Sequence, residues 1–255
     1  MPEQAPNFVV KLADCEADLK AAQELRYDVF SRELGANGAT VCHQRLCEQD
    51  RYDPYCDHLL LLDQTKLTKK VVGVYRLLRE SAAKRAGGFY SENEFDLSQL
   101  RKSGRNLLEL GRTCLHPDYR GGAGMFHLWS ALADYSEAHG SDLLFGTASF
   151  QGTNTELLAQ PMSLLHHEFS APQELSAQAQ GSSAISMDIL SPDKISRRSA
   201  MLAMPALIKG YLRLGGRVGQ GAWIDHDFNT TDICLIMDAR NMTARQSLYR
   251  KRPAV

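Results

Sequence analysis

The sequence lacks the features that define several large classes of protein. Its 255 residues contain no apolar run that approaches the ~20 residues needed by a membrane-spanning helix. Its six cysteines include no CxxC pair, and Cys42 and Cys47 have no partners at zinc-finger spacing, so neither a disulfide framework nor a metal site is expected. Residues 1–7 show neither the basic flank nor the apolar segment of a signal peptide. We therefore expect a cytoplasmic protein with reduced thiols.

A strong net charge is also absent, but the charge is unevenly divided along the chain. The formal net charge is −1. From residue 194 onward, eleven Lys and Arg stand against four Asp, a balance of +7, whereas residues 1–193 carry eighteen basic and twenty-six acidic side chains, a balance of −8. This basic part suits an acidic partner protein or an anionic membrane, and the alternative is a merely solvated surface. No nucleic-acid-binding motif is present, so no nucleic acid partner is expected. The candidate patch consists of Arg197, Arg198, Lys209, Arg213, Arg217, Arg245, Arg250, Lys251 and Arg252.

The apolar pattern alternates between strands and helices, which is typical of an α/β or α+β domain. Hydrophobic residues make up 44% of the chain and charged residues 23%, as in ordinary globular proteins. The periodicity predicts helices over residues 16–34, 125–139 and 205–214. It predicts strands over residues 58–62, 71–78, 106–115, 143–150, 219–225 and 232–238. Residues 170–184 are rich in small and polar side chains and are expected to form a loop.

The most informative segment is residues 106–138, which reads as strand, glycine-rich loop and helix. Glycines leave backbone N–H groups uncovered, and these donors suit a phosphate at a helix N-terminus. Arg120 would add a positive charge to the same place. An ordinary strand-to-helix turn would have the same composition. The residues expected to hold a phosphate are Arg120, Gly121, Gly122 and Gly124.

Charged side chains interrupt the predicted strands and need partners. Arg76 stands in an apolar strand end, where it requires a carboxylate or a ligand, and the candidate carboxylates are Asp50, Asp53 and Glu109. Glu109 and Arg112 are three residues apart, so a regular strand would place them on opposite faces. A β-bulge would bring them to the same face.

Taken together, these motifs resemble the GNAT superfamily of acyltransferases, in particular its autoinducer-synthase branch. Other segments are similar to the L-ornithine Nα-acyltransferases of ornithine-lipid synthesis, and the likeness extends over nearly the whole chain. The glycine loop departs from the usual GNAT pattern because it is one residue short. The first resemblance rests on residues 25–30, 33–35, 74–78 and 109–112 together with Asp50 and Asp53. The second rests on residues 144–153, 164–166, 205–215 and 228–232.

The resemblance implies both a fold and an activity. The fold would be a single GNAT-like domain over residues 1–255, with a central mixed, twisted sheet, helices on both faces and two splayed parallel strands. Its basic part, about residues 194–255, would cover an acyl pocket. The activity would be transfer of a 3-hydroxyacyl group from acyl carrier protein to the α-amine of L-ornithine, giving lyso-ornithine lipid. The donor group would be the carrier's 4′-phosphopantetheine arm, and no permanently bound cofactor or metal is implied. Peripheral contact with an anionic inner membrane is a further expectation.

The resemblance also implies roles for individual residues. Glu109 would be the general base, with Arg112 and Arg76 beside it, although Glu109 could instead hold one of these arginines in place. A backbone N–H near Gly111 or Arg112 would bind the oxyanion. Ser149 belongs to a run of small residues that would leave space for the donor. The acceptor amino acid would be bound by Arg26, Phe30, Asp50 and Asp53.

Three alternatives remain open at this stage. An acyl-homoserine-lactone synthase that uses S-adenosylmethionine would share the N-terminal motifs. Glutamine or lysine could replace ornithine as the acceptor. A carrier-protein or lipid-binding module could keep the fold without turnover. For Arg26, four residues before Phe30 on a predicted helix, a surface salt bridge is the ordinary expectation.

Overall fold

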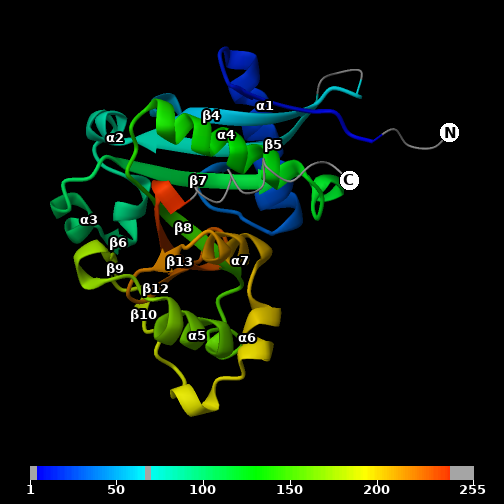
Figure 1. Ribbon diagram of the computed structural model, residues 1–255. Coiled ribbons are helices and arrows are strands. Elements are labelled where there is room, and N and C mark those ends of the chain that lie inside the picture. The colour runs from blue at the N-terminus through cyan, green and yellow to red at the C-terminus, as the bar shows by residue number, and fades with distance from the viewer. Residues whose placement is uncertain (1–4, 67–69, 242–255) are drawn as a thin grey trace, which may run out of the picture.

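The computed structural model describes residues 5–66 and 70–241, and its centre is a nine-stranded mixed sheet (Figure 1). The strand order is β1-β4-β5-β7-β8-β13-β12-β10, with β11 also paired to β13. Among the described strands of this sheet, only β7 and β8 are parallel neighbours. The strands are β1 (Phe8–Leu12), β4 (Asp57–Asp63), β5 (Lys70–Arg79), β7 (Leu107–Leu115), β8 (Leu143–Gln151), β10 (Ala184–Ile185), β11 (Arg217–Val218), β12 (Ala222–Asp225) and β13 (Thr230–Asp238).

Helices and two small ladders surround this sheet. The two ladders pair β2 (Val41–Cys42) with β3 (Cys47–Glu48), and β6 (Phe95–Asp96) with β9 (Gln178–Ala179). The α-helices are α1 (Glu16–Arg26), α2 (Glu80–Ala86), α3 (Ser98–Lys102), α4 (Gly124–Ala138), α5 (Ala159–Phe169), α6 (Arg197–Ala203) and α7 (Ala206–Arg213). A π-helix, η1 (Tyr27–Glu33), and the 3-10 turns η2 (Asp53–Tyr55), η3 (Tyr90–Asn93), η4 (Pro117–Tyr119), η5 (Gln173–Leu175) and η6 (Pro192–Lys194) complete the described part of the chain.

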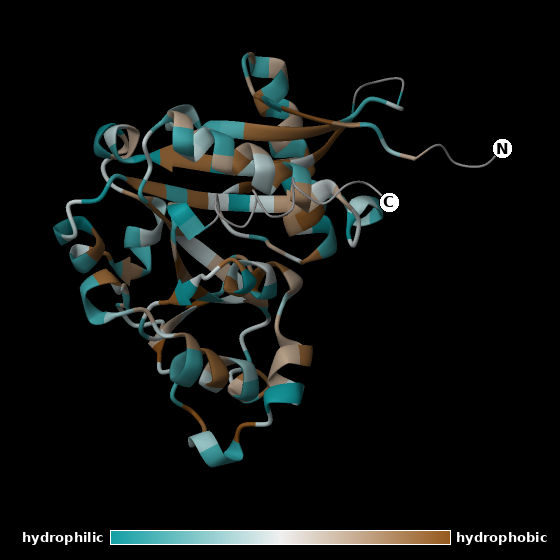
Figure 2. Ribbon diagram, viewed as in Figure 1, coloured by the Kyte–Doolittle hydropathy of each residue, from teal (hydrophilic) through white to brown (hydrophobic). Residues whose placement is uncertain are grey.

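Helices α1 and α4 cover opposite faces of the sheet because the strands are apolar on both sides. Leu60 packs in the same buried cluster as Leu25 of α1. Its strand neighbours Leu59 and Leu61 point the other way and pack in the cluster that contains Leu128 and Leu132 of α4. Strands covered on both faces read as continuous apolar runs. Figure 2 shows this, and also shows the hydrophilic segments that interrupt β7.

The two parallel strands separate after three residue pairs. Strand β7 pairs with β8 only from Leu107 to Glu109. A side chain at Gly146 would place its Cβ 2.0 Å from the carbonyl oxygen of Leu110, so glycine is required where the strands part. The predicted splaying of parallel strands is thus confirmed.

The predicted β-bulge is also present, in β7. Val74 of β5 pairs with Cys114 and Arg76 pairs with Gly111, so two steps along β5 span three along β7. The bulge contains Arg112, whose φ of +50° lies in the left-handed region. Arg112 therefore departs from regular strand geometry at the place where it lines the pocket described below.

Most predicted elements are confirmed, but the first helix differs in form. It continues to Glu33 and stops before Gly35, whose φ is +82°, as predicted. From Tyr27 onward, however, it is a π-helix rather than an α-helix. The wider turn changes the spacing of side chains around the helix, and such segments often occur at functional sites. In the predicted loop 170–184, the structure adds short pairings of β9 and β10.

Candidate active site

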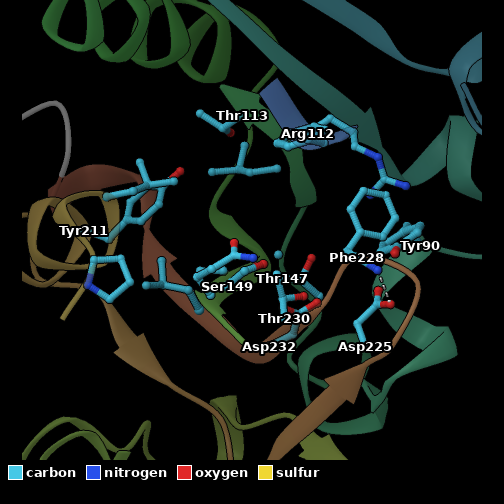
Figure 3. Close-up of a pocket in the computed structure, with 18 of the residues that line it drawn as sticks. Tyr90, Arg112, Thr113, Thr147, Ser149, Tyr211, Asp225, Phe228, Thr230 and Asp232 are labelled. Carbon is cyan, nitrogen blue, oxygen red and sulfur yellow. Dashed lines mark hydrogen bonds between the residues drawn. The ribbon is translucent and has the colours of Figure 1, made fainter. Parts of the chain in front are cut away.

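The opening between β7 and β8 leads into a pocket of about 320 Å³ (Figure 3). A larger cavity of about 760 Å³ adjoins it on the side of the glycine loop. The two hollows adjoin, because they share five lining residues, and we call the pair the passage: Phe30, Leu34, Thr113, Pro205 and Leu207. The shared residues come from η1 and its end, from β7 and from the start of α7.

Three arginines and three carboxylates form a buried network behind the pocket, which we call the arginine network. Arg26 is fully buried. Its Nε lies 2.7 Å from an oxygen of Glu48, and its two terminal nitrogens donate to the two oxygens of Asp53 at 2.9 and 2.6 Å. Arg26 is therefore a structural member of this network and does not line the pocket. Its complete burial overturns the expectation of a surface salt bridge.

Arg76 and Arg112 complete the arginine network. Arg76 donates to Asp50 at 2.7 Å and to Asp53 at 2.9 Å. Arg112 donates to Glu48 and to Asp50, both at 3.1 Å. Burial alone would raise the pKa of Asp50, but Arg76 and Arg112 hold it below the usual value. Because Asp50 and Asp53 are already satisfied by arginines, their carboxylates are not presented to the pocket.

Arg112 is the member of the arginine network that reaches the pocket. Its guanidinium lies 4.6 Å from the ring centre of Tyr90 and 4.7 Å from that of Phe228. Figure 3 shows both rings beside the arginine at one end of the pocket. Two carboxylates from behind and two aromatic rings in front fix its position. The arginine network therefore holds the bulge of β7 and the wall of the pocket in place.

Glu109 lies outside the pocket lining and supports a neighbouring turn. One of its oxygens accepts from the backbone N–H of Tyr90 at 2.8 Å, and the other accepts from the N–H and hydroxyl of Ser91 at 2.6 and 2.5 Å. Burial raises its pKa, and these donors oppose the rise. Glu109 thus positions Tyr90, which is a pocket residue. Its role as general base stays a prediction.

The glycine loop opens onto the larger cavity. Gly121 and Gly122 line it, and a Cβ on either would meet no atom within 4 Å, so their backbone is accessible. Arg120 also lines the cavity, while its guanidinium donates to both oxygens of Glu33 at 2.5 and 2.7 Å. Gly124 is buried at the start of α4 and is not among the lining residues. The loop and the N-terminus of this 15-residue helix can receive an anion.

Three buried carboxylates gather at the opposite end of the passage. Glu94, Asp225 and Asp232 have carboxylate oxygens within 4.8 Å of one another, and we call them the acid trio. Asp225 and Asp232 line the pocket. Burial raises the pKa of Asp232 to about 6, and burial with repulsion from the two neighbours raises that of Glu94 well above its usual value. Ser149, aligned with Asp232 across the β8–β13 pair, lines the pocket too.

The structure places some of the predicted site residues in the pocket lining and others in the arginine network. Phe30 and Ser149 line the pocket as predicted, with Arg112. Sequence reasoning missed Tyr90 and the acid trio. Residues 228–232 resemble a family motif, but its single aspartate does not indicate that two more carboxylates lie beside it.

The predicted basic patch is only partly described. Arg213 is exposed and lines the larger cavity. Arg197 pairs with Glu168, and Arg217 donates to the carbonyl of the same residue. Lys209 donates to the carbonyl of Met201. Arg245, Arg250, Lys251 and Arg252 lie outside the described residues. Within residues 5–66 and 70–241, no helix is long and apolar enough to cross a membrane.

The splayed parallel strands, the bulge and the glycine loop before a helix define a GNAT-type acyltransferase fold. In agreement, the family model described as an acetyltransferase (GNAT) domain matches residues 25–130. The CoA-dependent acyl-homoserine lactone synthase BjaI superposes with a TM-score of 0.56 at 15% identity, covering 98% of this chain and 92% of that one.

Sequence relatives narrow this class to one family. The L-ornithine Nα-acyltransferase of Rhodobacter capsulatus is 48% identical over 250 residues, which cover 96% of each chain. The protein of the same name from Brucella abortus is 39% identical over 248 residues, covering 95% of this chain and 88% of the relative. The chain belongs to the L-ornithine Nα-acyltransferase family.

Proposed function

We propose that the protein transfers a 3-hydroxyacyl group from the 4′-phosphopantetheine thioester of acyl carrier protein to the α-amine of L-ornithine. The product is lyso-ornithine lipid. The observation that carries this proposal is the adjoining pair of hollows, one at the glycine loop and one lined by acids, in a chain that is related over 96% of its length to an L-ornithine Nα-acyltransferase. One end of the passage suits a phosphate and the other suits a cation.

The donor enters from the glycine loop. The phosphate of the pantetheine arm binds to the N–H groups of Gly121 and Gly122 at the N-terminus of α4, and Arg120 adds charge. The arm then runs along the larger cavity toward the opening between β7 and β8. The exposed Arg213 at this cavity suits the acidic carrier protein.

Acyl transfer takes place at the bulge of β7. The neutral α-amine attacks the thioester carbon, and backbone N–H groups at the bulge stabilise the oxyanion. The carbon–sulfur bond then breaks, the amide forms and the thiol leaves. The α-ammonium loses one proton to the solvent before the attack, and the nitrogen loses a second proton to a base as the amide forms, from which it passes to the departing thiolate.

The variant Glu109→Gln distinguishes between two roles of Glu109, that of a general base and that of a residue that positions Tyr90. A base contributes ~10²–10⁴ in rate, and its loss removes the acidic limb of the pH–rate profile. If Glu109 only positions Tyr90, the rate falls while the limb remains. Ser91→Ala is the matched variant, because it weakens the same contact without removing the carboxylate.

The direct test of the proposed function is product analysis with purified components. The protein is incubated with 3-hydroxyacyl carrier protein and L-ornithine, L-glutamine or L-lysine in parallel, and the products are identified by mass spectrometry. S-adenosylmethionine is the fourth acceptor, since a lactone synthase would release methylthioadenosine from it. Formation of acyl-ornithine supports the proposal. Acyl-homoserine lactone, another acyl-amino acid as the main product, or binding without turnover would refute it.

The proposed place of reaction is the cytoplasm, with peripheral contact to the anionic inner membrane. The product carries an acyl chain and must reach a lipid phase, and the basic C-terminal quarter suits an anionic surface. Co-sedimentation with vesicles tests the contact. Binding to anionic vesicles at low salt, and not to zwitterionic ones, is the expected result.

A further inference from the structure

The acid trio is drawn from three segments that are far apart in the sequence. Glu94 follows η3, Asp225 ends β12 and Asp232 lies in β13. The three side chains belong to residues that are 2%, 6% and 4% exposed. Three carboxylates held this close and this deeply repel one another and lose hydration. The charged forms of these three side chains therefore destabilise one another in the folded chain.

Within the described residues, no Lys, Arg or His forms an ion pair with the acid trio. Asp225 accepts from the backbone N–H of Phe228 at 2.9 Å (Figure 3). One oxygen of Glu94 and one of Asp232 are buried without a hydrogen-bond partner. The charge of Arg112 lowers the pKa of both Asp232 and Glu94, but its guanidinium is already paired with Glu48 and Asp50. A buried carboxylate oxygen without a donor is costly, and a cationic donor would satisfy it.

We propose that the acid trio is the subsite for the side-chain ammonium of the acceptor amino acid and makes the enzyme selective for a diamino acid. This inference rests on the proposed function. Asp225 and Asp232 face the pocket, and Glu94 closes the cluster behind them. An ammonium group offers three N–H donors, one for each carboxylate. This assignment replaces Asp50 and Asp53, whose oxygens the arginine network already occupies.

The geometry of the pocket favours an organic ammonium over a bare metal ion. The space next to Asp225 and Asp232 continues along Thr147 and Thr113, and its volume of about 320 Å³ accommodates a small amino acid. Held by its side chain at the acid trio, the acceptor presents its α-amine toward the rest of the same pocket, where the bulge of β7 forms the wall. The acid trio therefore selects the acceptor and leaves the other amine free to react.

Two acceptors that differ only in the ammonium group test this inference. L-norvaline has the carbon chain of ornithine without the side-chain amine. In the parent protein, kcat/KM for ornithine should exceed that for norvaline by on the order of 100-fold. Asp232→Asn should remove most of this preference by lowering the ornithine value, while the norvaline value stays within about threefold. Asp193→Asn, which makes the same charge change on an exposed turn, should leave both values unchanged.

The results with the two acceptors can also overturn the inference. Equal losses on both acceptors in Asp232→Asn would overturn the subsite, since they would place the residue at the α-amine or in the fold. Asp225→Asn provides the same comparison if the first variant does not fold. Tight binding of Mg²⁺ or Ca²⁺ by the parent, lost in Asp232→Asn and not displaced by ornithine, would also overturn it. If the parent acylates neither amino acid, the proposed function itself has failed.

Discussion

The arginine network, which includes Arg112, and the acid trio are two buried ionic clusters that differ in charge balance. In the arginine network, three guanidinium groups face three carboxylates, and every one of these charges has a partner within 3.1 Å. In the acid trio, three carboxylates face one another without a cation of their own. The first cluster is complete in the free protein. For the second, we propose that the ammonium group of a ligand supplies the missing positive charge.

The difference separates structural charges from functional ones. Buried ion pairs contribute little net stability, but they are costly to break and they fix geometry. Uncompensated buried charges lower stability and persist where a site uses them. Variants of the two clusters should therefore change stability in opposite directions, and the following predictions are ordered from the largest expected effect to the smallest.

Removing Arg26 should cause the largest loss of stability. Arg26→Met leaves Glu48 and Asp53 buried without their closest cation, which should cost about 3–5 kcal/mol in the free energy of unfolding. Urea unfolding measures this loss. Arg32→Met, which breaks an exposed i,i+4 pair with Asp28, is the matched control and should change stability by less than about 1 kcal/mol. A similar small change for both variants would refute a structural role for the network.

Removing a member of the acid trio should stabilise the free protein. Because the pKa of Asp232 is raised from 3.8 to about 6, the folded state binds its proton more tightly than the unfolded state. The unfolding free energy therefore falls as pH rises from about 4 to 6 and stays lower above that range. Asp232→Asn should recover roughly 1–3 kcal/mol at pH 8 and little at pH 4. Thermal unfolding at both pH values, with Asp193→Asn as control, measures this effect, and destabilisation at pH 8 would contradict it.

The acceptor's KM should depend on pH in the same range. Below about pH 6, protonation of Asp232 removes the negative charge that holds an ammonium group. The groups that face it are the charged Glu94, Asp225 and Arg112 and the hydroxyls of Ser149 and Thr230. The KM for ornithine should rise up to about tenfold per pH unit as pH falls below 6, while that for norvaline stays level. Parallel changes for the two acceptors would assign the titration to another step.

The exposed charges at the glycine loop should matter least for stability and mainly for the donor. Arg120→Ala breaks the pair with Glu33, which should change unfolding free energy by less than about 1 kcal/mol. It should raise the KM for acyl carrier protein several-fold without changing that for ornithine. Glu33→Gln breaks the same pair but keeps the arginine, so the carrier KM should not rise. An increase in both variants would show that the pair itself supports the loop.

The sequence predicted much of the fold because the signals were local. The apolar runs of β4, β5, β7 and β8, and the glycines that end helices, marked the elements within a few residues. Spacing alone predicted the bulge at Arg112, since Glu109 and Arg112 could not otherwise share a face.

The partners of the charged residues could not be predicted in this way. Of the candidate partners of Arg76, Asp50 and Asp53 are confirmed. The acid trio, in contrast, depends on contacts between Glu94 and residues more than a hundred positions later. No periodicity reports such contacts. Burial was equally hidden, because the fully buried Arg26 has the same local pattern as a helix-surface arginine.

The acid trio takes two of its three members from the β12–β13 hairpin, beyond the residue range shared with GNAT domains in general. The passage for the thioester is built mainly from the earlier strands and the glycine loop. On the proposed assignment, most of the subsite for the nucleophile and most of the subsite for the activated acid therefore come from separate stretches of the chain. If that assignment holds, a few substitutions in one terminal hairpin would change the head group of the resulting lipid and leave the part that handles the fatty acid unchanged.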